Sequence, residues 1–264
     1  MNYSKMLAVA VFGIAFSGGV FGQAPDQSET QYLDQLEQDK TEYNRSLITE
    51  LGGFKKFDSM PMLTALLKVK ERVVWLSERT AKPDSDFRLG YALAVYQSKI
   101  GDTQDAAITL ATADVRAFVD SQRCEDKSSP PARLTPWRNA AQGVYQVIRA
   151  LPQEQKAKIR AAVEQEEPKL ALRTPSPWMC NGGAKQVIKV LQKYPEIGAL
   201  DGGKPIPQAI LDKYPNVVSV KEGRVELTDY SIQPDFMSEE SWKKDLPIMI
   251  QAFKKSYFAT LGLN

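Results

Sequence analysis

The chain has 264 residues, of which 43% are hydrophobic and 25% charged, a composition typical of a globular protein with a sizeable core. Its 34 lysines and arginines nearly balance its 32 acidic residues, and bases alternate with acids along most of the chain, which argues against a nucleic-acid-binding surface. The sequence contains no histidine. This excludes Ser-His-Asp and Cys-His catalysis and every metal site that uses histidine.

The N-terminus has the pattern of an export signal. Lys5 precedes an uncharged, mostly apolar run from Met6 to Phe21, and Val20 and Gly22 occupy the positions that a signal peptidase recognises. We predict a signal peptide over residues 1–22 that is removed after Gly22, which leaves no stable membrane span in the mature chain. The apolar run is rich in Ala, Val and Gly, as in bacterial signals, so we expect a periplasmic protein, or a secreted one if the host is not Gram-negative.

The elements that follow the signal are predicted to be helical. Residues 28–50 form one long amphipathic helix, which begins with a capping box at Ser28–Gln31 and ends at Gly52–Gly53. A second helix begins near Pro61 and has apolar residues over a broad face, so we expect it to be largely buried. These apolar residues are Leu63, Leu66, Leu67, Val73, Val74 and Leu76.

The apolar run from Phe87 to Val119 is predicted to form two helices that fold back on each other at Gly101–Asp102. Asp84 or Ser85 should cap the first of them. No charged residue lies between positions 91 and 98, so this helix should be surrounded by protein. The second helix carries an apolar stripe with the helical period, and its small residues allow a neighbouring helix to approach closely.

This hairpin resembles a tetratricopeptide or Sel1-type helical repeat from Leu93 onward. The matching positions are Ala94, the turn at Gly101, and Ala106, Leu110 and Ala113 in the second helix. Two features depart from the family pattern: the aromatic residue of the first helix lies one place away, and the terminal proline is missing. Antiparallel helix pairs of this kind stack to leave a groove, in which we expect a protein partner to bind. A helical hairpin without this ancestry would explain the same residues.

The rest of the chain alternates irregular stretches with further helices. Prolines and serines over residues 124–136 predict a surface loop. Two helices are expected over 135–151 and 152–167. Residues 217–227 form the one convincing β-hairpin, with Gly223 in its turn. A capped helix from Ser238 closes the chain, with a kink or its true start at Pro247.

These elements define a mainly α fold of stacked antiparallel helical hairpins, with a small C-terminal α+β part that contains one β-hairpin. We divide the chain into the signal peptide at residues 1–22, a helical domain at residues 23–200, and a C-terminal β-hairpin plus helix at residues 201–264. The last part is expected to pack on the helical domain, because two strands alone are only marginally stable in water.

Two cysteines, Cys124 and Cys180, remain after export. In an oxidising compartment two lone cysteines pair by default, so we predict a structural disulfide between them, with a reactive thiol or a pair of metal ligands as the alternatives. A disulfide would exclude thiolate catalysis and cysteine-bound zinc. We therefore predict no catalytic residue, no metal and no cofactor.

The loop before Cys180 carries the best candidates for contact with a protein partner. Trp178 and Met179 form an apolar pair there, which is either a plug over the core or an exposed recognition patch. We take Trp178 and Arg173 as the anchors, because tryptophan and arginine dominate the energetics of interfaces. Lys221 and Arg224, at the tip of the predicted β-hairpin, complete the set.

By exclusion, the sequence favours a non-enzymatic exported protein that binds another protein, most simply an inhibitor or immunity-type protein that neutralises a secreted toxin or hydrolase. An envelope assembly adaptor is one alternative. A carrier of a small ligand would have a pocket lined by Tyr91, Tyr96 or Trp137. An envelope enzyme acting on glycan would need two acids roughly 5–10 Å apart in a cleft, with Asp201 or Asp235 as candidates.

Overall fold

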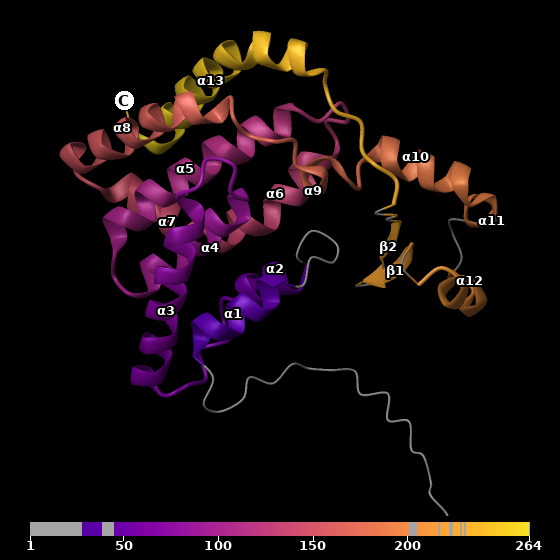
Figure 1. Cartoon of the computed structure of the whole chain (residues 1–264), viewed down its shortest axis with the longest axis horizontal. Coiled ribbons are helices and arrows are strands. Elements are labelled where there is room, and N and C mark those ends of the chain that lie inside the picture. Colours follow the sequence, from indigo (N-terminus) through magenta and orange to yellow (C-terminus); the bar gives the residue numbers. More distant parts are fainter. Residues whose placement is uncertain are drawn as a thin grey trace, which may run out of the picture.

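The computed structural model describes residues 28–38, 45–200, 205–215, 217–221, 224–227, 229 and 231–263. This part of the chain is mainly helical, as predicted (Figure 1). None of its helices combines the length and the hydropathy that a membrane span requires. The predicted signal peptide, residues 1–22, lies outside the described residues.

Three helices precede the central hairpin: α1 (Glu29–Gln38), α2 (Arg45–Gly52) and α3 (Met62–Thr80). The Ser28 hydroxyl accepts a hydrogen bond from the Gln31 N–H at 3.2 Å, which confirms the predicted start of the first helix. The middle of the single helix predicted over 28–50, residues 39–44, lies outside the described residues. The two flanking segments, α1 and α2, pack against each other.

Helix α3 corrects the prediction of a largely buried helix. Its inner face, with Arg72 and Trp75, is buried against α1 and against α4 (Phe87–Lys99). Its outer face exposes Leu63, Leu67 and Val74 by 68%, 54% and 61%. The prediction was wrong because α3 is apolar on more than one face and its neighbours cover only the inner one.

The central hairpin consists of α4 and α5 (Thr103–Gln122), which turn at Gly101 with a φ of +90°. Glycine adopts this left-handed conformation without the steric cost that a side chain would bring. Residues 87–97 of α4 are all buried, which confirms the prediction from the uncharged run. The helix is surrounded because α3, α5 and later helices pack around it.

Gly90 of α4 lies directly against Ala113 of α5. A Cβ atom at position 90 would be 2.8 Å from the Ala113 Cβ, inside the contact distance of two carbons. We therefore expect Gly90→Val to lower the free energy of unfolding in urea by about 1–3 kcal/mol, because the helices must move apart. Gly143→Val is the matched control, since a Cβ there would meet nothing within 4 Å. Equal losses in the two variants would contradict the close approach.

Three helices follow the hairpin: α6 (Ser129–Ala140), α7 (Gln142–Ala150) and α8 (Gln153–Leu170). Helix α6 begins within the predicted surface loop, so the loop prediction was wrong from residue 129 onward. Pro130 and Pro131 lie in its first turn, where a missing N–H costs no helical hydrogen bond. Helices α7 and α8 both pack on α5, which lies at the centre of the molecule.

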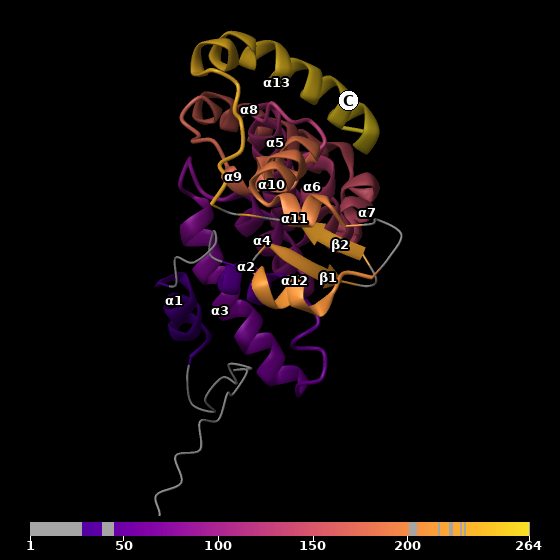
Figure 2. The same ribbon diagram turned by 90° about the vertical axis from the view of Figure 1, so that its right-hand side faces the viewer.

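The C-terminal third contains short elements: α9 (Pro177–Cys180), α10 (Ala184–Lys193), α11 (Pro195–Gly198), α12 (Gln208–Lys213), β1 (Val218–Lys221) and β2 (Arg224–Leu227). The two strands pair antiparallel, with Val218 opposite Leu227. Residues 222–223, which include the turn glycine, lie outside the described residues. Helices α10 to α12 and the strands gather at one end of the molecule (Figures 1 and 2).

The last helix, α13 (Glu239–Leu261), returns along the helical body and packs on α5 and α7. The Ser238 hydroxyl accepts from the Ser241 N–H at 3.2 Å, so the helix begins where the sequence predicted. Pro247 lies inside this helix and does not mark its start. The return segment is fixed to the end of α5, because Met237 N–H donates to the Arg123 carbonyl at 2.8 Å.

Candidate partner-binding site

The loop that was predicted to bind a partner is tied to the end of α5. Cys180 and Cys124 form a disulfide, with their sulfurs 1.97 Å and their Cα atoms 5.1 Å apart. The Ser129 hydroxyl of α6 donates to the Met179 carbonyl at 2.8 Å, and the Arg133 Nε donates to the Asn181 carbonyl at 3.0 Å. The loop is therefore fixed to α6 on both sides of Cys180, and by the disulfide to the end of α5.

Arg173 is not the exposed anchor that the sequence predicted, because its side chain is buried in an ion pair. Its Nε and Nη2 donate to the two carboxylate oxygens of Asp120 at 2.8 and 2.5 Å. Its Nη1 donates to the carbonyls of Pro83 and Ser85, each at 3.0 Å. The guanidinium thus joins three parts of the chain: its own segment after α8, the turn before α4, and α5. Its role is structural. Burial raises the pKa of the Asp120 carboxyl, and Arg173 opposes that rise.

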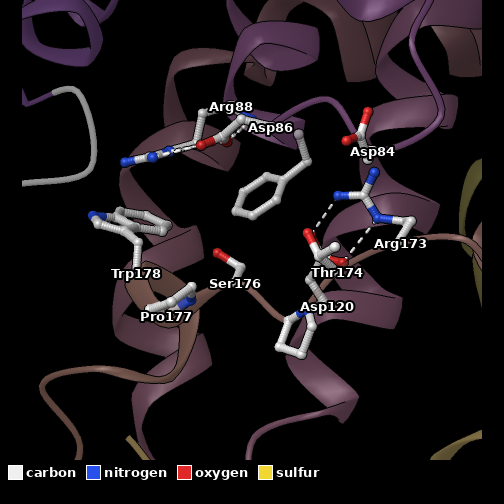
Figure 3. Close-up of a pocket in the computed structure, with 11 residues that line it drawn as sticks. Asp84, Asp86, Arg88, Asp120, Arg173, Thr174, Ser176, Pro177 and Trp178 are labelled. Carbon is white, nitrogen blue, oxygen red and sulfur yellow. Dashed lines mark hydrogen bonds and ion pairs between the residues drawn. The ribbon is translucent and has the colours of Figure 1, made fainter. Parts of the chain in front are cut away.

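A cleft of about 220 Å³ lies beside this pair, between the start of α4 and the loop before α9 (Figure 3). Asp86, not the predicted Asp84 or Ser85, caps α4, since its carboxylate accepts from the Arg88 N–H at 2.9 Å. The Arg88 guanidinium also pairs with Asp86 at 2.5 Å. Burial raises the pKa of Asp86, but the charge and hydrogen bonds of Arg88 outweigh burial and hold it below its usual value.

Trp178 lies half-buried at this cleft, whereas its neighbour Met179 is fully buried. The Trp178 ring lies 4.3 Å from the Arg88 guanidinium and 5.4 Å from that of Arg133. Its centroid is 6.0 Å from the Phe87 ring. The prediction that Met179 contacts a partner was wrong, because Met179 fills the core. The partly exposed ring of Trp178 is what this loop can still present to a partner.

The two strand residues of the predicted site do not extend this surface. Lys221 and Arg224 are opposite each other in the β1–β2 register, and their side chains lie outside the described residues. Figures 1 and 2 both place the strands away from α9. The residues chosen from the sequence therefore do not form one contiguous contact surface.

An exposed apolar surface that the sequence did not predict lies on α3. We define the α3 stripe as Leu63, Leu67, Lys70 and Val74, which are four, three and four residues apart and so share one helix face. Met62, 87% exposed, lies beside it in the first turn of the helix. Exposed apolar residues gathered on one face mark interaction sites more often than scattered ones do. The signal in the sequence was an apolar surface too broad for one buried face.

The residues predicted for the other functions lie elsewhere. Tyr91, Tyr96 and Trp137, expected to line a ligand pocket, are buried in the core. Asp235, expected as a catalytic acid, pairs with Lys189 at 2.7 Å, and Asp201 lies outside the described residues. Among the described residues, no group of three or more cysteines and acids is placed to hold a metal ion.

Comparisons with known proteins give no relative from which to transfer a function. No protein-family model matches the chain, and no curated protein or solved structure matches it. The resemblance of the central hairpin to a tetratricopeptide or Sel1-type repeat therefore stays a prediction.

Proposed function

We propose that this chain is an exported, non-enzymatic protein that binds another protein through the α3 stripe. The observation that carries the proposal is the exposure of Leu63, Leu67 and Val74, by 54% to 68%, on a helix whose opposite face is held in the core. Covering such side chains stabilises a complex by roughly 25 cal/mol per Å² of apolar surface. Export is supported by the signal-like pattern of residues 1–22.

The charges along α3 favour a different protein over a second copy of this chain. An antiparallel pair of α3 helices that covered all the apolar residues would place Lys70 opposite Leu67 of the other copy. Sliding the pair to bring Lys70 opposite Glu78 would leave Leu63 beyond the end of the partner helix. An apolar segment of another protein, with one carboxylate opposite Lys70, covers all the apolar residues and also pairs with the lysine. We propose a secreted toxin or hydrolase with such a segment, which this chain would neutralise as an inhibitor or immunity protein.

Photo-crosslinking tests the position and the kind of partner. We expect a benzophenone side chain at position 67, in the producing cells, to give one adduct with a different protein. The same group at Lys158, exposed on α8, is the control and should not give that adduct. An adduct between two copies of this chain, or the same adducts from both positions, would overturn the proposal.

Binding of the captured protein must then depend on the α3 stripe when both proteins are purified. We expect Leu67→Ser and Lys70→Glu each to weaken its binding about tenfold, because one removes apolar contact area and the other places like charges together. Lys158→Glu, a charge change of the same size on α8, should leave the affinity unchanged. Wild-type affinity in both α3 variants would mean that the adduct arose from chance proximity and would reject the α3 stripe.

A further inference from the structure

A second cavity, of about 470 Å³, lies where α13 packs on α5 and α7. Its walls are largely apolar, with Phe118 from α5 and with Phe253, Tyr257 and Leu261 from α13. The Phe118 and Phe253 ring centroids are 5.0 Å apart, and the Phe253 and Tyr257 rings stack at 4.8 Å. A preformed concave pocket of this size and composition is typical of small-molecule sites.

The floor of the cavity is a buried carboxylate that is already saturated by protein donors. Asp114 of α5 accepts from the Tyr145 hydroxyl at 2.9 Å and from the Tyr257 hydroxyl at 2.8 Å. The Tyr91 hydroxyl donates to it from α4. Burial raises the pKa of Asp114, and the hydrogen bonds from the tyrosines oppose that rise. With three hydroxyl donors, Asp114 fixes the cavity walls and has little capacity left for a cationic ligand.

The mouth of the cavity carries two arginines. Arg138 is 44% exposed, and its Nε lies 3.9 Å from a carboxylate oxygen of Asp114. Arg149 is exposed on α7, and within the described residues its guanidinium makes no hydrogen bond or ion pair. Two cations against one carboxylate leave the site with a positive balance. Guanidinium groups bind carboxylates through paired hydrogen bonds, so this mouth suits an anionic head group.

We propose that this cavity binds a small amphipathic carboxylate, separately from the partner-binding surface on α3. Its carboxylate would contact Arg138 and Arg149, and its aliphatic or aromatic body would lie against Phe118, Phe253 and Leu261. The apolar walls account for a hydrophobic body, and the two arginines account for the negative charge. Neither feature alone would select this class of ligand.

Calorimetric titration of the purified chain with matched probes tests both halves of the proposal. Decanoate and 2-naphthoate supply a carboxylate on an aliphatic and an aromatic body, and decanol and 2-naphthylmethanol are their neutral counterparts. We expect at least one carboxylate to bind at a single saturable site, about tenfold more tightly than its alcohol. If neither carboxylate shows saturable binding, the proposal is overturned. It is also overturned if the protein binds each carboxylate and the matching alcohol with equal affinity.

Three variants then locate the site. Arg149→Gln should weaken carboxylate binding about fivefold or more and leave alcohol binding unchanged, because it removes only the charge at the mouth. Lys255→Gln, which removes an exposed charge of α13 outside the cavity lining, should change neither. Leu67→Ser should bind both the carboxylates and the alcohols with wild-type affinity. An effect in Leu67→Ser with none in Arg149→Gln would assign the probe to the α3 stripe and reject the cavity.

Discussion

Replacing Arg173 with methionine should lower the free energy of unfolding by about 3–5 kcal/mol, measured by urea denaturation at neutral pH. The expected effect is large because Arg173 and Asp120 are both buried, 4% and 1% exposed. Without the guanidinium, Asp120 would remain in the interior without the counter-charge that donates hydrogen bonds to both its oxygens. The carbonyls of Pro83 and Ser85 would also lose the donor that they share.

Two further variants separate the ion pair from a general effect of substitution. Arg173→Met combined with Asp120→Leu should recover part of the loss, because the double change leaves no orphaned carboxylate. Lys185→Met, which breaks the exposed pair between Lys185 and Glu125 at 3.2 Å, should cost less than about 1 kcal/mol. If Arg173→Met lowers the free energy of unfolding no more than Lys185→Met does, Arg173 has no structural role. It would then again be a candidate for contact with a partner.

The central hairpin could be predicted from the sequence because its signals are local. An uncharged run over residues 91–98 requires burial wherever the helix lies in the fold. Gly101 marks the turn through its own backbone preference. Ala113 is small because Gly90 approaches it across the hairpin, so the residue type reflects the contact directly.

The charged residues of α5 could not be placed in the same way. Charged residues are almost never fully buried unless they are paired, so a periodic pattern assigns them to solvent. On α5, Arg116 pairs with Glu166 at 2.6 Å and Asp120 with Arg173, partners that are 50 and 53 residues distant in the chain. Nothing within one helix shows that such a partner exists.

The two candidate sites depend on the same kind of long-range information. Both faces of α3 are apolar, and only the positions of α1 and α4 determine which face is covered. The cavity brings Asp114 and Tyr257 together across 143 residues of sequence. The predicted site failed at Arg173 for the converse reason, since residue type alone does not distinguish an interface arginine from a buried ion pair.

Removing the disulfide between Cys124 and Cys180 should lower the free energy of unfolding by about 4 kcal/mol, because the bridge closes a loop of this length in the unfolded chain. The bonded residues are 56 positions apart, and the segment between them contains α6, α7 and α8. The test compares the wild type, oxidised and reduced, with the Cys124→Ala, Cys180→Ala double variant. Both ways of removing the bond should shift the urea midpoint equally.

The folded state should survive this loss, since hydrogen bonds from Ser129 and Arg133 still hold the loop on α6. Helical circular dichroism should therefore stay native, and the loss should appear in unfolding alone. Because the disulfide constrains the unfolded chain and Arg173 acts in the folded one, removing both should cost about the sum of the two losses. A combined loss well below that sum would show that the two contacts are coupled in the folded state, and a loss below about 1 kcal/mol without the disulfide would contradict the chain-entropy argument.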